Sequence, residues 1–208
     1  AGGLVPVTNG LVPEPARALP ALGYTALAVD MFGDGKQTDD PGEADKLSGH
    51  VAGNLPLMKA RFDAALSLLR KHKTVDPKRI AAIGYSFGGK VVLDMARQGV
   101  NLAGMVSYWG LVGTQHPAQK GRVKTKVLVF NGKDDPMAPP EQIRQFRQEM
   151  TAAGVDYRLV DYPGLKHAFT RPDANARGKK HNLPLAYDAE ADRKSWAEMQ
   201  AFFRRVFR

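Results

Sequence analysis

The chain of 208 residues contains no cysteine. Disulfide bonds, thiolate metal sites and a thiol nucleophile are therefore excluded, and the composition fits a reducing compartment. No apolar run approaches the roughly 18 residues that a membrane-spanning helix needs. The opening residues, Ala1-Gly2-Gly3, lack the charged start and the apolar stretch of a signal peptide. We therefore predict a cytoplasmic protein with no membrane partner.

Acidic residues are fewer than basic ones, with 21 Asp and Glu against 30 Lys and Arg, which gives a net charge of +9. The basic residues concentrate in Arg177–His181 and Arg204–Arg208. Neither run interleaves aromatic residues as a surface for single-stranded nucleic acid does. We interpret them as solvated surface charge and predict no nucleic-acid partner, while a polyanion-binding protein stays an alternative class.

Hydrophobic residues make up 43% of the chain, which is ordinary for a globular protein, and the length predicts one domain over 1–208. Short apolar runs alternate with segments of helical periodicity, which indicates an α/β protein with a mostly parallel sheet flanked by helices. The expected strands are Thr25–Asp30, Ile80–Tyr85, Gly104–Trp109, Val127–Asn131 and Tyr157–Tyr162. The expected helices are Leu55–Lys71, Lys90–Arg97, Glu141–Ala153 and Ala189–Phe207.

Function in such sheets gathers outside the carboxyl ends of the strands. The Gly-rich and Asp-rich stretch Gly33–Lys46 follows an expected strand, and we predict that it forms a loop on that side. The sequence Gly84-Tyr85-Ser86-Phe87-Gly88 follows another, directly before a helix. This G-x-S-x-G pattern between a strand and a helix is typical of a nucleophile elbow, so Ser86 is the candidate nucleophile.

A serine hydroxyl needs a general base, and an acid must orient that base. The order nucleophile, acid, base disfavours the histidines that precede Ser86, whereas His167 follows the last expected strand. The acid should lie in the loop Gly132–Pro139, after the preceding strand. Either Asp134 or Asp135 could serve, and spacing alone does not separate them.

These separated motifs resemble the dienelactone hydrolase family from about Ala21 to the C-terminus. They comprise Leu22–Gly33, Asp76–Tyr85, Asp134–Pro139, Tyr162-Pro163-Gly164, His167-Ala168-Phe169 and Tyr187-Asp188. The resemblance implies an α/β-hydrolase fold and an esterase or lactonase without metal or organic cofactor, as a monomer or homodimer. It also favours Asp135 as the acid, because the family's aspartate lies four residues before a proline, here Pro139.

The chain departs from the family pattern in three respects. The family often has cysteine where this chain has Ser86, so Ser86 is either native or a Cys-to-Ser replacement that leaves a slow or inactive enzyme. No His-Glu-aromatic loop is present, and no room is left for the family's early strands before Thr25. We therefore expect that N-terminal strands are missing, and that either Ala1–Val5 is a remnant of that loop or the loop lies upstream of Ala1. The oxyanion donors are then the backbone N–H groups of Phe87 and Leu4.

Aromatic residues at the expected strand ends, together with Met137, indicate a largely apolar substrate pocket for aryl or short acyl groups. The pocket residues are Tyr85, Tyr108, Trp109 and Met137. The predicted function is hydrolysis of a small carboxylic ester or lactone through a Ser-His-Asp triad and an acyl-enzyme. The alternatives are promiscuous phosphotriester hydrolysis at the same site and a non-catalytic binding protein with this fold.

Overall fold

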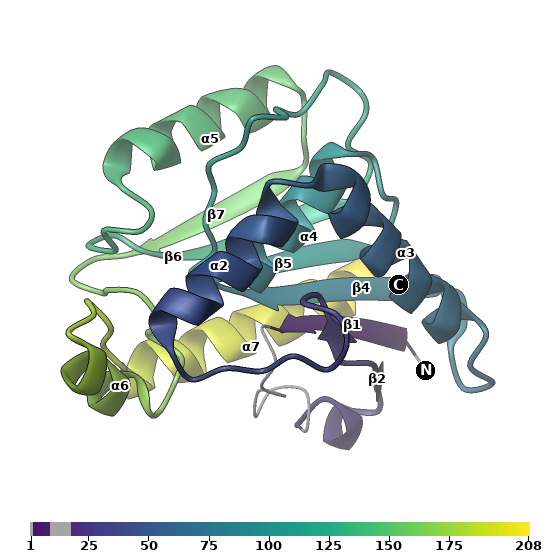
Figure 1. Ribbon diagram of the computed structural model, residues 1–208. Coiled ribbons are helices and arrows are strands. Elements are labelled where there is room, and N and C mark those ends of the chain that lie inside the picture. Colours follow the sequence, from purple (N-terminus) through teal and green to yellow (C-terminus); the bar gives the residue numbers. More distant parts are fainter. Residues whose placement is uncertain (1, 9–17) are drawn as a thin grey trace.

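The computed structural model describes residues 2–8 and 18–208. A seven-stranded, wholly parallel sheet runs through it in the order β2-β1-β4-β5-β6-β7, with β3 also paired to β1 (Figure 1). The strands are β1 (Gly2–Thr8), β2 (Thr25–Ala26), β3 (Val29–Asp30), β4 (Asp76–Tyr85), β5 (Gly104–Tyr108), β6 (Lys126–Gly132) and β7 (Tyr157–Tyr162).

Helices cover both faces of this sheet, as Figure 1 shows. The described helices are η1 (Pro20–Leu22), α2 (Pro41–Ala52), α3 (Leu55–Arg70), α4 (Phe87–Arg97), α5 (Pro140–Ala152), α6 (Ala174–His181) and α7 (Ala189–Val206). Buried side chains of α2 to α5 share one core with one face of the sheet, and those of α7 share a second core with the other face. The sheet is therefore the middle of three layers.

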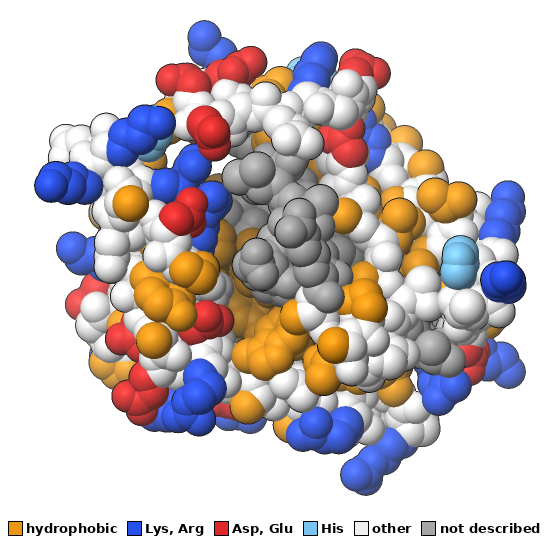
Figure 2. Space-filling view, turned by 90° about the horizontal axis from the view of Figure 1, so that it is seen from below, with side chains coloured by type: hydrophobic (Ala, Val, Ile, Leu, Met, Phe, Trp, Pro, Cys, Tyr) orange, Lys and Arg blue, Asp and Glu red, His pale blue; other side chains and the backbone are white. Residues whose placement is uncertain are grey.

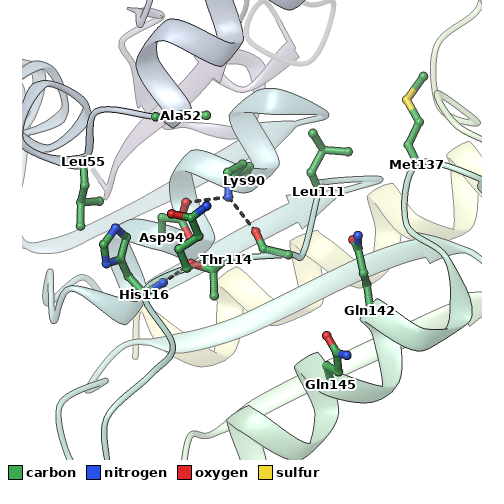
Figure 3. A pocket seen from close by; sticks show the side chains of 13 residues that line it. Ala52, Leu55, Lys90, Asp94, Leu111, Thr114, His116, Met137, Gln142 and Gln145 are labelled. Atoms are coloured by element: carbon green, nitrogen blue, oxygen red, sulfur yellow. Dashed lines mark hydrogen bonds and ion pairs between the residues drawn. The ribbon is translucent and has the colours of Figure 1, made fainter.

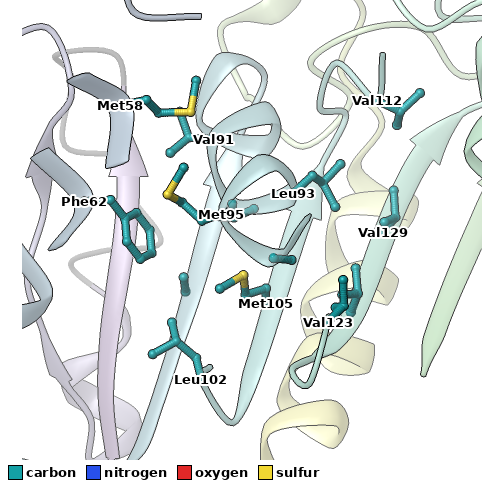
Figure 4. Close-up of a cluster of buried hydrophobic side chains, with 14 of the residues drawn as sticks. Met58, Phe62, Val91, Leu93, Met95, Leu102, Met105, Val112, Val123 and Val129 are labelled. Atoms are coloured by element: carbon teal, nitrogen blue, oxygen red, sulfur yellow. The ribbon is translucent and has the colours of Figure 1, made fainter. Parts of the chain in front are cut away.

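Strand β4 shows how the sequence builds both cores. Ile80 and Ala82 belong to the core under α3 and α4, whereas Ala81 and Ile83 belong to the core against α7, as the alternation of side chains along a strand requires. All four are buried, so this strand reads as a continuous apolar run. Figure 4 shows the first core, where the Met95 and Met105 side chains lie between helix and sheet.

Glycine brings α7 close to the second face of the sheet. A Cβ atom on Gly104, the first residue of β5, would lie 2.6 Å from the Phe202 ring. Phe202 and its neighbour Phe203 are both buried in the core that α7 forms with the sheet. The final helix therefore packs directly on the strand, and the apolar face expected for Ala189–Phe207 is the one that it buries.

The expectation that no strand precedes Thr25 is wrong. Strand β1 (Gly2–Thr8) lies inside the sheet, between β4 on one side and the short strands β2 and β3 on the other. The expected strand Thr25–Asp30 is split into β2 and β3, and both pair with β1. Ala1–Val5 is therefore mostly strand, apart from Ala1, which lies outside the described residues. The Gly-Gly start obscured this strand, because glycine is uncommon in strands.

The stretch Gly33–Lys46 is only partly a loop, because α2 begins at Pro41. Asp40 caps this helix, and its carboxylate accepts a hydrogen bond from the Glu43 N–H at 2.7 Å. Asp at the N-cap followed by Pro at the first helical position is a helix start signal that the prediction missed. The basic run Arg177–His181 is likewise helical and lies in α6.

Basic side chains do not gather into one patch on the face that Figure 2 shows. Lys and Arg side chains lie around its margins, with Asp and Glu side chains among them. The interpretation of the two basic runs as solvated surface charge stays a prediction. No helix among the described residues is long and apolar enough to span a membrane.

Candidate active site

The turn between β4 and α4 holds Ser86 in a strained conformation. Its backbone angles are φ 52° and ψ −118°, a region that residues with a side chain rarely adopt. The Ser86 N–H donates to the Tyr108 carbonyl of the neighbouring strand at 3.1 Å, and the Ser86 carbonyl accepts from the Lys90 N–H, also at 3.1 Å. These bonds fix both ends of the turn, so that the hydroxyl lies where β4 meets α4.

The first glycine of the motif, Gly84, is required by contact. A Cβ atom on Gly84 would lie 2.0 Å from the Gly88 carbonyl oxygen, a distance that no packing adjustment can relieve. Strand and helix therefore approach each other more closely than any side chain at position 84 permits. Gly89, one residue further, would place a Cβ atom 2.7 Å from the Gly110 Cα atom. The pattern read from the sequence is thus a steric requirement of the turn.

The structure brings Ser86, His167 and Asp135 together. The Ser86 Oγ atom lies 2.9 Å from His167 Nε2, and His167 Nδ1 lies 2.7 Å from Asp135 Oδ2. The side chains of His167 and Asp135 are buried, with exposed fractions of 5% and 1%. Neutral His167 with its proton on Nδ1 donates to the carboxylate and can accept the serine proton at Nε2.

The loop after β6 separates the two aspartates that spacing left open. Asp135 is buried and its Oδ1 atom accepts from the Met137 N–H at 2.8 Å, whereas Asp134 is exposed. Gly132 lets the two loops meet, because a Cβ atom there would lie 2.5 Å from the Leu165 carbonyl oxygen. The Asp134 N–H donates to that same carbonyl at 2.9 Å. Asp135 is therefore the aspartate that contacts the imidazole.

Backbone contacts hold the loop that carries His167. His167 forms an isolated parallel bridge with Leu185, and its carbonyl accepts from the Ala186 N–H at 3.2 Å. The following residue, Ala168, has φ 62° and is buried. This positive φ is rare for alanine and shows that the surrounding contacts determine the loop conformation.

Trp109 contacts the histidine instead of an open cleft. It is 6% exposed and has φ 38°, and its ring lies 4.9 Å from the His167 ring at 77°, an edge-to-face arrangement. Its indole N–H donates to Thr170 Oγ at 2.9 Å. Sequence reasoning missed Thr170, and no pattern in the chain marks it. Trp109 thus lies at the site, as the wall against which the base packs.

Tyr85 and Tyr108 were expected in the substrate pocket, and the structure places them in the core against α7. They stack at 4.8 Å, and the Tyr108 hydroxyl donates to the Ser195 carbonyl of α7 at 3.1 Å. Burial raises the pKa of both hydroxyls well above their usual range. The reason is strand alternation: Tyr85 follows Ile83 on the face that points away from α4.

Of the two predicted oxyanion donors, one lies at the elbow. Phe87 is the first residue of α4, where helix N–H groups have no partner within the helix. Its side chain is buried and stacks on Phe32 at 5.7 Å. Leu4 instead pairs with Ala81 within the sheet, while Val7 is the residue of β1 opposite Gly84. Leu4 therefore lies well away from Ser86, and the carboxyl end of β1 lies beside the elbow.

Met137 lines a cavity of about 600 Å³, and the three triad residues are not part of this lining. Its other lining residues are Ala52, Gly53, Leu55, Lys90, Asp94, Leu111, Gly113, Thr114, Gln115, His116, Gln142 and Gln145. Most of these carry polar side chains, so the pocket is less apolar than the sequence suggested. In the part of the chain that the structure describes, no group of three or more His, Asp or Glu side chains could hold a metal ion.

Comparison with known proteins decides the family. The model of the dienelactone hydrolase family matches residues 11–207. The chain belongs to the dienelactone hydrolase family. It is therefore a hydrolase with the α/β-hydrolase fold, as the resemblance implied.

Among solved members of this fold, a dienelactone hydrolase-like promiscuous phosphotriesterase from metagenomic libraries is 32% identical. It has a TM-score of 0.88, and the match covers 100% of this chain and 87% of that one. A second structure, m3DLH, is 33% identical with a TM-score of 0.90 and the same coverage. A Yersinia pestis relative named "Putative carboxymethylenebutenolidase" is 25% identical over 202 residues, which cover 92% of this chain and 72% of the relative.

Proposed function

We propose that the protein hydrolyses small carboxylic esters or lactones through an acyl-enzyme on Ser86. The observation that carries this proposal is the continuous hydrogen-bonded path from Ser86 Oγ to His167 at 2.9 Å and on to Asp135 at 2.7 Å. Family membership supports the same chemistry, since the Yersinia pestis relative is named for the hydrolysis of a lactone.

The first half of the reaction forms the acyl-enzyme. His167 Nε2 takes the proton of Ser86 as the serine oxygen attacks the carbonyl carbon, and Asp135 stabilises the resulting imidazolium. The Phe87 N–H at the start of α4 donates to the oxyanion, with a second donor from the carboxyl end of β1. The ester C–O bond then breaks, and His167 returns the proton to the leaving alcohol.

The second half releases the acid. A water molecule gives its proton to His167 and attacks the acyl carbon, and the bond to Ser86 Oγ breaks as the proton returns to the serine. In a lactone the alcohol and the acid are parts of one molecule, so a hydroxy acid is the product. Both halves use the same three side chains.

Turnover of p-nitrophenyl acetate and labelling by a fluorophosphonate test this proposal. The parent protein should show both, and Ser86→Ala should lose labelling and at least about 10³-fold in turnover. Ser67→Ala is the matched control, because Ser67 lies exposed on α3 and should change neither. A parent that shows no turnover and no labelling would contradict the proposal.

The nucleophile can be compared directly with the residue frequent in this family. If Ser86 is the native nucleophile, Ser86→Cys should hydrolyse the same esters no faster than the parent. A large gain on Ser86→Cys, with a nearly inactive parent, would mean that the pocket is built for a thiolate. Ser86→Cys differs from the parent only by sulfur in place of oxygen, so both proteins should fold alike.

A second candidate activity is phosphotriester hydrolysis at the same serine. The observation that favours it is the 32% identity, over the whole of this chain, to a structure named as a promiscuous phosphotriesterase. Ser86 would attack phosphorus and expel the best leaving group, and water would have to release the phosphoryl-serine. Slow turnover of diethyl p-nitrophenyl phosphate would support this activity, whereas a single burst of p-nitrophenol without turnover would show that release fails.

A further inference from the structure

The cavity that Met137 lines has a floor of charged side chains that neutralise one another (Figure 3). Lys90 Nζ lies 3.0 Å from Asp94 Oδ2 and donates to the Gly113 carbonyl at 2.7 Å. The other carboxylate oxygen of Asp94 accepts from Arg97 at 2.9 Å, and Arg97 also pairs with Glu149 at 2.8 Å. Two cations thus meet two anions, and the floor offers no excess charge to an ion.

This compensation selects against a charged ligand. An anion that approached Lys90 Nζ would also approach the Asp94 carboxylate, which is bonded to that ammonium group. A cation would meet Lys90 itself. An uncharged polar group meets neither penalty, since a hydroxyl can accept from one group and donate to another.

Unused hydrogen-bonding capacity remains in the lining. An ammonium group has three donors; Lys90 donates one to the Gly113 carbonyl, and the Asp94 carboxylate is its ion-pair partner at 3.0 Å. The Gln142 carboxamide makes no hydrogen bond to another residue that the structure describes, and it lies against Gly113, where a Cβ atom would be 3.2 Å from its Oε1 atom. A hydroxyl between Lys90 and Gln142 could therefore bond to both.

Apolar side chains make up another part of the lining, and one of them, Met137, lies near the triad. Met137 is two residues after Asp135, and its N–H donates to the Asp135 carboxylate. Lys90 is one helical turn after Ser86, about 5.4 Å along the axis of α4. Together with Leu111 and Leu55, the Met137 side chain gives the cavity apolar surface that suits a methylene chain.

We propose that this cavity binds an uncharged, hydroxyl-bearing alkyl substituent of the ester substrate. The acyl carbon lies at Ser86, the chain passes Met137, and the hydroxyl bonds to Lys90 and Gln142. This inference rests on the proposed ester hydrolysis, and it names the substrate class that the site takes.

Three p-nitrophenyl esters of one chain length test the selectivity: the hexanoate, the 6-hydroxyhexanoate and the hydrogen adipate. We expect kcat/KM for the 6-hydroxyhexanoate to exceed that for the hexanoate by about fivefold, the size of one net hydrogen bond. The adipate, which ends in a carboxylate, should be the poorest substrate. Equal rates on the first two, or the highest rate on the adipate, would overturn the proposal.

Two matched variants on α5 test whether the preference for the 6-hydroxyhexanoate arises in this cavity. Gln142→Trp fills the cavity and should abolish the preference for the 6-hydroxyhexanoate over the hexanoate. Gln148→Trp places the same side chain on an exposed position of α5 outside the lining, and it should retain the preference. A preference that survives Gln142→Trp would assign it to another surface and overturn the proposal.

Binding without turnover separates this inference from the proposed function. In Ser86→Ala, 6-hydroxyhexanamide should shift the NMR signals of the Gln142 carboxamide and the Thr114 amide more than hexanamide does. If the parent hydrolyses no ester but these shifts occur, the proposed function fails and the binding site stands. If esters are hydrolysed but neither amide shifts these signals, the cavity proposal fails alone.

Discussion

The indole ring of Trp109 packs edge-to-face on the His167 ring at 4.9 Å while its N–H bonds to Thr170, three residues further along the histidine loop. Thr170→Val should therefore lower kcat by roughly 10- to 100-fold with little change in KM, because it releases the loop that orients the base. Thr170→Ser keeps the hydroxyl and should retain most of the activity. Trp109→Phe already lacks the hydrogen bond to Thr170, so adding Thr170→Val to it should lower kcat little further. If the two substitutions lowered kcat independently, Trp109 and Thr170 would not act through this bond.

Asp135→Asn should lower kcat by about 10³-fold or more, because an amide that donates to Nδ1 selects the wrong imidazole tautomer. Asp134→Asn is the control: Asp134 is exposed, and its carboxylate makes no hydrogen bond to another described residue. Ester turnover by both variants, with circular dichroism to check folding, distinguishes them. Comparable losses in the two would mean that the loop, and not Asp135, carries the effect.

Gly132→Ala should destabilise the protein by about 1–3 kcal/mol and lower turnover, because its Cβ atom would lie 2.5 Å from the backbone oxygen of Leu165 in the histidine loop. Gly49→Ala, inside α2 and with no atom within 4 Å of the added Cβ, should stabilise by up to about 1 kcal/mol. Urea unfolding followed by fluorescence measures both. A stable, fully active Gly132→Ala would contradict the close approach of the two loops.

Arg97→Met should lower the free energy of unfolding by about 3–5 kcal/mol, because the side chain is fully buried and its loss leaves Glu149 without its cation and Asp94 with Lys90 alone. Arg144→Met is the matched change at the surface, where Arg144 pairs with Glu141 and is 65% exposed. It should cost at most about 1 kcal/mol. Similar losses of unfolding free energy in the two variants would contradict the larger contribution expected of the buried ion pairs.

Burial raises the pKa of Asp192, and the hydrogen bond from the Tyr187 hydroxyl offsets part of that rise. The folded state then binds more protons than the unfolded state just above pH 3.8, the ordinary Asp value, so this residue lowers stability as the pH rises through that window. Asp192→Asn should therefore gain stability over the parent as the pH rises from 3.8 through the raised pKa of Asp192, and the gain should then level off. Melting temperatures across that range test this, and a constant difference between the two proteins would contradict it.

The local sequence was sufficient to predict the turn at Ser86 and most of the helices. Gly84 and Gly88 flank Ser86 because strand and helix meet at that turn, which is a contact between near neighbours in the chain. The final helix was predictable for a similar reason, since its apolar face repeats with the helical period. Chain order, together with the position directly after the last expected strand, then favoured His167 among five histidines.

Contacts between distant segments were decided only by the tertiary structure. Asp134 and Asp135 are neighbours with the same chemistry, and only the path of the loop after β6 determines which one meets His167. Tyr85 and Tyr108 lie at strand ends, but the pleat turns them toward α7 and away from the substrate. An ion-pair network joins α4 to α5 through Lys90, Asp94, Arg97 and Glu149. Arg97 and Glu149 are 52 positions apart in the chain, so no local sequence pattern predicts their contact.

The sequence by itself thus predicted the serine of the elbow, the histidine that contacts it and the class of fold, because glycine sterics and side-chain periodicity act over a few residues. The tertiary structure decided the contact between His167 and Asp135, which the family resemblance had favoured, and it decided the strand before Thr25 and the polar lining of the cavity. Each of these depends on which face a side chain presents and on what lies opposite it, and those relationships exist only once the sheet and its helices have packed.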